Sequence, residues 1–123
     1  MTRLAEQKNE INVVNDQWGC PTYAGDLADF IVALISQGFD KYGIYHFSND
    51  GLLTWYDFAR AIFKLQSVNI KINPIPSSEY PTPALRPAFS KLDTTLLSSS
   101  FGFVMKDWKE SLKTCLSRSQ ISS

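Results

Sequence analysis

The sequence predicts an α/β fold in which short strands alternate with helices, and two kinds of periodicity support this prediction. Segments 11–14, 43–48 and 70–75 alternate apolar and polar positions and are rich in β-branched or aromatic residues, as strands are. Between these segments, apolar residues recur at the three- and four-residue spacing of amphipathic helices. The alternation of the two patterns along the chain is typical of a sheet covered by helices.

The first part of the chain predicts a strand, a loop and a helix. We expect residues 1–10 to be the tail of a truncated helix and 11–14 to be the first strand. A helix follows the loop, because its apolar positions fall at i, i+3, i+4 and i+7: Leu27, Phe30, Ile31 and Leu34. Asp26 is placed to cap the start of this helix, and Gly38 is placed to end it.

The central part predicts a second strand at 43–48, a helix and a third strand. Thr54 with Asp57 three residues later resembles a capping box at the start of the helix. Its expected buried stripe is Trp55, Phe58, Ala59 and Ile62. The strand at 70–75 ends where Pro74 and Pro76 remove backbone donors.

The last part predicts a proline-rich loop and two helices. Residues 76–87 hold four of the six prolines, too many for regular structure. We expect a short helix over 91–100 and a final helix that begins near Asp107, with the stripe Trp108, Leu112, Cys115 and Leu116. Residues 117–123 should fray. No linker divides the chain, so residues 1–123 are expected to form one portion.

Composition excludes several classes of function. The 123 residues carry 12 basic and 12 acidic side chains, so no net charge attracts nucleic acid or an anionic membrane. The longest apolar run, 30–35, is too short to span a bilayer, and no signal peptide is visible. We therefore expect a cytoplasmic protein. Cys20 and Cys115 have no metal-ligand spacing; a reducing compartment favours thiols, although a disulfide between them stays open.

Several catalytic and cofactor motifs are missing from these residues. The sequence has no G-x-G-x-x-G turn, no P-loop and no G-x-S-x-G elbow, and no cluster of residues with metal spacing. His46 is the single histidine, and its alternating neighbours favour a packed strand residue. A Ser-His-Asp set with Ser48 or Ser90 is the weaker alternative.

The loop D-Q-W-G-C-P-T over residues 16–22 is the first candidate binding segment. Gln17 and Thr22 offer hydrogen bonds to a polar ligand, while Pro21 restricts the backbone. Trp18 is explained by packing or, as an alternative, by stacking on a base. The loop is explained equally well as one that only caps the following helix.

Arg86 is the second candidate. Prolines on both sides of it stiffen the segment and lower the entropy cost of holding its guanidinium in one place. The forked donors of a guanidinium suit a pyrophosphate or a carboxylate. An arginine on an ordinary surface loop remains the alternative.

Six stretches taken together resemble one known family. The stretches are V-V-N-D-Q-W-G-C-P-T at 13–22, D-L-A at 26–28, G-I-Y-H-F-S at 43–48, T-W-Y-D-F-A at 54–59, E-Y-P-T-P-A-L-R-P at 79–87 and S-K-L-D at 90–93. In this order they are similar to the C-terminal portion of the dTDP-4-dehydrorhamnose reductases, a family of extended short-chain dehydrogenases/reductases. The resemblance covers about Leu4 to Leu116 and implies part of an NAD(P)-binding Rossmann-type fold.

The resemblance implies a function for the parent enzyme. Such reductases reduce the C4 ketone of dTDP-4-dehydro-L-rhamnose with NADPH, or NADH in some members, to give dTDP-L-rhamnose for cell-surface polysaccharide and lipopolysaccharide. Arg86 would then lie near the substrate diphosphate, and residues 17–22 would line the sugar–nucleotide cleft. The family's Y-x-x-x-K pair and glycine-rich turn are not in this sequence. We therefore expect no catalytic or cofactor-binding residue, no cofactor and no activity without an N-terminal Rossmann portion.

Two other interpretations remain at this point. One is a non-catalytic regulatory member of the same superfamily that binds a partner enzyme, and the other is the matching portion of a nucleotide-sugar epimerase or dehydratase. Apolar faces that would normally pack on a larger sheet also predict self-association or a homo-oligomer.

Overall fold

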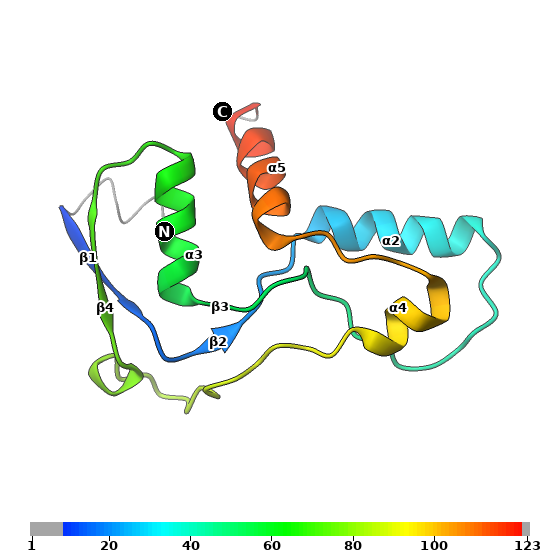
Figure 1. Cartoon of the computed structure of the whole chain (residues 1–123), viewed down its shortest axis with the longest axis horizontal. Coiled ribbons are helices and arrows are strands. Elements are labelled where there is room, and N and C mark those ends of the chain that lie inside the picture. Colours follow the sequence, from blue (N-terminus) through cyan, green and yellow to red (C-terminus); the bar gives the residue numbers. More distant parts are fainter. Residues whose placement is uncertain (1–8, 122–123) are drawn as a thin grey trace. The chain divides into compact units, whose positions relative to one another are not determined.

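The computed structural model describes residues 9–121 (Figure 1). These residues fall into two compact units. Unit 1 holds residues up to Gly19 together with Leu52–Lys91, and unit 2 holds Cys20–Gly51 together with the residues from Leu92 on. Each unit is therefore built from two separate stretches of the chain. Because both units draw on both halves of the chain, no linker segment separates them in the sequence. The sequence therefore predicts a single portion.

Unit 1 is built on a parallel pair of strands, β1 (Glu10–Val14) and β4 (Lys71–Ile75). Ile11 lies opposite Ile72, and Val13 lies opposite Pro74, in a two-stranded sheet. Parallel strands need a crossover connection, and α3 (Trp55–Leu65) lies in it. Ala59, Ile62 and Phe63 bury the inner face of that helix. Both predicted strands and the helix are confirmed.

The start of α3 confirms the predicted capping box. The Thr54 hydroxyl accepts a hydrogen bond from the Asp57 backbone N–H at 3.2 Å, and the Asp57 carboxylate accepts one from the Thr54 N–H at 3.1 Å. The same hydroxyl lies 2.9 Å from Oδ1 of Asn15, just after β1. Thr54 is 2% exposed, so one buried side chain joins the helix start to the strand end.

A second small sheet and a loop complete unit 1. The strands β2 (Trp18–Gly19) and β3 (Leu53–Thr54) pair antiparallel. The Pro-rich loop, residues 76–90, begins with a single 3₁₀ turn, η1 (Ser77–Glu79), and then has no regular structure until Phe89 pairs with Trp18. The absence of regular structure after η1 agrees with its proline content.

Unit 2 contains three helices around a cluster of aromatic rings. The helices are α2 (Ala24–Ser36), α4 (Thr95–Phe101) and α5 (Trp108–Ile121). Phe30 on α2 is 6% exposed and packs against Phe47, Phe101 and Phe103, with ring centroids 5.5, 6.1 and 4.8 Å away. Gly51 has φ 129°, and a Cβ there would lie 2.3 Å from the Trp108 ring, so glycine is required.

Some predicted element boundaries differ from those of the structure. The short helix starts at Thr95 rather than 91, because the Asp93 carboxylate accepts the Thr95 backbone N–H at 2.9 Å. Gly102, with φ 63°, ends it as predicted. Helix α5 is helical as far as Ile121, so fraying of the last residues stays a prediction, and Cys115 in the predicted stripe of this helix is exposed. Glu10 begins β1, and most of the expected N-terminal helix tail, residues 1–8, lies outside the described residues.

The predicted strand at 43–48 is also wrong. The segment alternates half-buried Tyr45 and Phe47 with exposed Ile44 and His46, so it has the expected period of two. Within the part of the chain that the structure describes, no strand pairs with it; only Asp50 beyond it forms a bridge, with Asp107. The alternation reflects an extended segment that packs aromatic rings on one side. His46 is therefore not a buried strand residue.

A buried carboxylate holds unit 2 together and corrects the predicted helix cap. Helix α2 begins at Ala24, and Asp26 in its first turn is 5% exposed. Its carboxylate accepts hydrogen bonds from the Asn49 amide at 2.7 Å, from the Ser111 hydroxyl and from the Lys106 ammonium at 3.0 Å. Burial raises the pKa of Asp26, but these hydrogen bonds outweigh it, so the pKa is lowered overall.

Replacement of Thr54 should show the value of the cap. In Thr54→Ala the helix loses its capping hydroxyl and the link to Asn15, so we expect the free energy of unfolding to fall by about 1–2 kcal/mol in urea titrations. The control is Thr94→Ala, because Thr94 occupies the N-cap of α4 without a side-chain cap bond. Equal losses in the two variants would contradict the assigned role of Thr54.

Asp26 should make unit 2 sensitive to acid. Because its pKa is lower in the folded than in the unfolded chain, its contribution is complete above the unfolded value of about 4 and is lost as pH falls through the folded value. Asp26→Asn should lower the free energy of unfolding by about 1.5–3 kcal/mol at pH 7. The gap to the unmodified chain should shrink below about pH 4, whereas exposed Asp40→Asn should leave the profile unchanged. A gap that stays constant with pH would refute this account.

Candidate functional site

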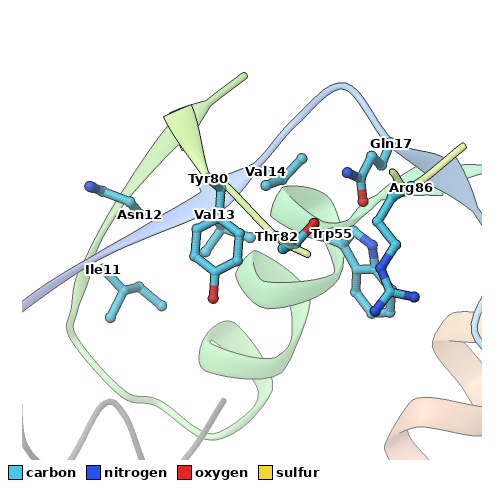
Figure 2. A pocket seen from close by; sticks show the side chains of 9 residues that line it. All are labelled: Ile11, Asn12, Val13, Val14, Gln17, Trp55, Tyr80, Thr82 and Arg86. Atoms are coloured by element: carbon cyan, nitrogen blue, oxygen red, sulfur yellow. The ribbon is translucent and has the colours of Figure 1, made fainter. Parts of the chain in front are cut away.

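A cavity in unit 1 brings two of the predicted binding residues together (Figure 2). The cavity has a volume of about 420 Å³ and is lined by residues of β1, the segment after it, α3 and the Pro-rich loop. The lining residues are Ile11, Asn12, Val13, Val14, Gln17, Trp55, Tyr80, Thr82 and Arg86. Gln17 and Arg86 thus line the same pocket although they are far apart in the sequence.

The walls of the pocket combine apolar and polar side chains. Valines and an isoleucine of β1 line it together with the rings of Trp55 and Tyr80, which are 53% and 57% exposed. Gln17, Thr82 and Arg86 supply an amide, a hydroxyl and a guanidinium. In Figure 2, Gln17 and Arg86 lie on the opposite side of the view from Ile11 and Asn12. A few polar groups on a largely apolar wall are typical of small-molecule sites.

Hydrogen bonds connect the Pro-rich loop to the two residues on either side of Gln17. The Asp16 carboxylate accepts the Ser77 backbone N–H at 3.0 and 2.9 Å and the Ser77 hydroxyl at 2.8 Å. The backbone N–H of Trp18 donates to the Ala88 carbonyl at 2.8 Å, and the Trp18 carbonyl accepts a hydrogen bond from the Ser90 backbone N–H at 2.8 Å. Hydrogen bonds from the Ser77 backbone and then from its hydroxyl lower the pKa of Asp16. Asp16 is therefore charged at neutral pH.

The other predicted site residues lie elsewhere. Trp18 is 42% exposed, pairs through its backbone and is not among the lining residues. Pro21 and Thr22 belong to unit 2 and do not line the pocket of unit 1. In that unit, the loop around them is fixed by Asn49, whose side-chain oxygen accepts the Tyr23 N–H at 2.7 Å and whose carbonyl accepts the Cys20 thiol at 3.0 Å.

Sequence reasoning missed part of the lining. Trp55 was assigned to the buried stripe of α3, but it is the first residue of that helix and its ring lines the pocket. Tyr80 and Thr82 lie in the same proline-rich stretch as Arg86, which was the available signal for them. The pairing of β1 with β4 places the β1 side chains beside this loop, and only the fold shows that pairing.

The described residues support neither a Ser-His-Asp catalytic set nor a metal site. The Ser48 hydroxyl donates to the Asn49 carbonyl at 3.2 Å, so it is not directed at His46 in a catalytic set. Within residues 9–121, no group of three or more histidines, cysteines or carboxylates could hold a metal ion. None of the helices in that range is long and apolar enough to cross a membrane.

Known proteins are similar to this chain in sequence, and solved structures are similar to it in fold. The dTDP-4-dehydrorhamnose reductase of Aggregatibacter actinomycetemcomitans is 41% identical over 124 residues, which covers 92% of this chain and 42% of that protein. The Escherichia coli K12 reductase is 38% identical, with 94% and 42% covered. The chain thus spans about two fifths of the length of these curated relatives.

Solved structures agree. The crystal structure of a dTDP-4-dehydrorhamnose reductase from Clostridium acetobutylicum has a TM-score of 0.89 at 37% identity, covering 97% of this chain and 42% of that one. The reductase of Bacillus anthracis, solved in complex with NADP, has a TM-score of 0.83 at 36% identity, covering 91% and 38%. The model of the RmlD substrate binding domain matches residues 1–121. The chain therefore belongs to the RmlD substrate binding domain family.

Proposed function

We propose that this chain is the sugar-nucleotide-binding portion of a dTDP-4-dehydrorhamnose reductase and that the pocket of unit 1 takes the nucleoside diphosphate part of the substrate. The observation that carries the proposal is the meeting of Gln17 and Arg86 in one cavity beside two exposed aromatic rings. The named relatives, at 38–41% identity, support the substrate class.

Each lining group suits one part of such a ligand. The planar guanidinium of Arg86 can donate paired hydrogen bonds to diphosphate oxygens. The Gln17 amide both donates and accepts, which suits a sugar hydroxyl. The rings of Trp55 and Tyr80 offer apolar faces on which a pyrimidine base can stack. The apolar side chains of β1 exclude water from one side of the bound molecule.

NADPH, when bound, supplies the hydride for such a reduction. The usual dinucleotide and proton-transfer motifs are missing from this sequence: none of its six glycines follows the G-x-G-x-x-G spacing, and no tyrosine has a lysine four residues later. We therefore assign to this chain the binding and orientation of the substrate, and we place cofactor binding and proton transfer in the part of the relatives that it does not span.

Removal of the Arg86 guanidinium should weaken binding of a diphosphate. We expect wild-type chain to bind dTDP in the millimolar range by NMR titration, and Arg86→Ala to raise the dissociation constant more than about tenfold, the effect of losing one charged hydrogen bond. Binding of thymidine, which lacks the diphosphate, should not change. The matched control is Arg60→Ala, an exposed arginine of α3 whose guanidinium lies over the Tyr56 ring.

The outcomes of that titration separate the alternatives. Loss of dTDP binding in Arg86→Ala alone supports the assigned pocket. An equal effect of Arg60→Ala would point to nonspecific attraction between charges, and the same dissociation constant in all three proteins would refute the assignment of Arg86.

We also infer that the isolated chain associates with itself through α2. Ile31, Val32 and Ile35 on this helix are 47%, 63% and 75% exposed, which is unusual for adjacent apolar side chains on a helix of a monomer. Ile35→Glu should lower the mass measured by light scattering at high concentration. Ser36→Glu adds the same charge at a polar position and should have little effect; a monomeric wild-type chain would contradict the inference.

A further inference from the structure

The Pro-rich loop is attached at its two ends to two residues, Asp16 and Trp18, that are separated by one position. Ser77, at its start, is bonded to Asp16, and Ala88 and Ser90, at its end, are bonded to Trp18. Gln17 lies between these two attachment points and lines the pocket with Tyr80, Thr82 and Arg86 of the loop. The loop between the two attachments therefore carries three of the lining side chains, and Gln17 lies between the attachment points.

The two attachments differ in what they are made of. The Trp18 attachment consists of two backbone hydrogen bonds and a longer one, 3.3 Å, from the Ser90 hydroxyl to the Trp18 carbonyl, so a change of side chain leaves both backbone bonds in place. The Asp16 attachment uses a carboxylate that accepts both the N–H and the hydroxyl of Ser77. Ser77 is also the first residue of the 3₁₀ turn η1, in which the Glu79 and Tyr80 backbone N–H groups donate to the carbonyls of Pro76 and Ser77 at 3.0 and 3.1 Å. Tyr80 thus directly follows a turn whose first residue is held by a side-chain bond.

Continuity with β1 makes Asp16 a fixed point. Val14 pairs with Ile75 in the parallel sheet, and Asn15 extends the pairing by donating its N–H to the Ile75 carbonyl at 2.9 Å. Beyond this point the backbones no longer form ladder bonds, and the Asp16 carboxylate contacts Ser77 in their place. One side chain, that of Asp16, therefore holds the start of the loop in place next to the end of the sheet.

We propose that Asp16 is a positioning residue for the pocket: its bond to Ser77 fixes the start of the Pro-rich loop, so that Tyr80, Thr82 and Arg86 line the pocket with Gln17 before a ligand binds. A loop that is ordered in advance costs less to immobilise on binding. This inference rests on the proposed function only for the identity of the ligand. The order of the loop itself is a property of the free chain.

Amide hydrogen exchange of the free chain tests the positioning directly. In Asp16→Ala we expect the Tyr80 amide, which bonds within the 3₁₀ turn, to exchange about tenfold faster than in wild type. The Ser90 amide, held by the Trp18 backbone, should keep its rate. Ser77→Ala removes the hydroxyl but keeps the backbone bond, so its effect should be smaller. Unchanged Tyr80 exchange in Asp16→Ala would overturn the proposal.

Binding of dTDP tests whether the position of the loop matters to the ligand. We expect the dissociation constant of Asp16→Ala to rise about five- to tenfold, since binding must then order several side chains. If Asp16 acts through the loop, the double variant Asp16→Ala/Arg86→Ala should lose less affinity than the two single losses added together, because part of the effect of Asp16 passes through Arg86. Additive effects would overturn the proposal. Glu79→Gln, which removes one charge from the same loop, is the control for charge.

Failure of the proposed function would have a different signature. If wild-type chain does not bind dTDP while Asp16→Ala still accelerates Tyr80 exchange, the assigned ligand is wrong and the positioning by Asp16 stands. If dTDP binds and neither its affinity nor Tyr80 exchange responds to Asp16→Ala, the ligand assignment stands and the positioning role is refuted.

Discussion

The parallel pairing of β1 with β4 is the constraint on which the pocket of unit 1 depends. The register places Val14 opposite Ile75, so the segments that follow the two strands emerge at the same edge. One of these segments carries Asp16 and Gln17, and the other carries the Pro-rich loop with Arg86. The carboxyl edge of parallel strands is a common place for ligand sites, because side chains from separate loops meet there. Here the α3 crossover makes the pairing possible.

Unit 2 depends on a different interaction, the buried carboxylate of Asp26. A carboxylate with 5% exposure is costly unless its oxygens are satisfied. Asn49, Ser111 and Lys106 provide the donors, and they come from three separate parts of the unit. Asn49 also accepts the Tyr23 N–H, so the same network fixes the start of α2. The hydrogen bond that Lys106 itself donates to Asp26, together with the negative charge of that carboxylate 3.0 Å away, raises the pKa of Lys106.

Sequence patterns correctly predicted the features that depend on interactions between residues close together in the sequence. The capping box at Thr54 and Asp57 involves neighbours in the sequence, and the structure confirms it. The strand at 43–48 failed because a strand needs a partner, and alternation alone describes only an extended chain. Asp26 failed for a related reason: aspartate is equally suited to a helix cap and to a buried network, and the partners that decide between them, Asn49 and Ser111, are distant in sequence.

The site shows the same division. The content of glycine, proline and arginine pointed to Gln17 and Arg86 as candidates, and both line the pocket. The apolar wall of the pocket could not be predicted, because the valines of a strand resemble those of any core. Trp55 is the informative case. A tryptophan with half its surface exposed at the start of a helix contributes little to a core, yet it lines a cavity with exposed Tyr80 and a guanidinium. Single exposed apolar residues need no explanation, but two aromatic rings at one pocket do. A flat, partly polar ligand explains their exposure better than packing does, which is why the pocket carries the proposed function.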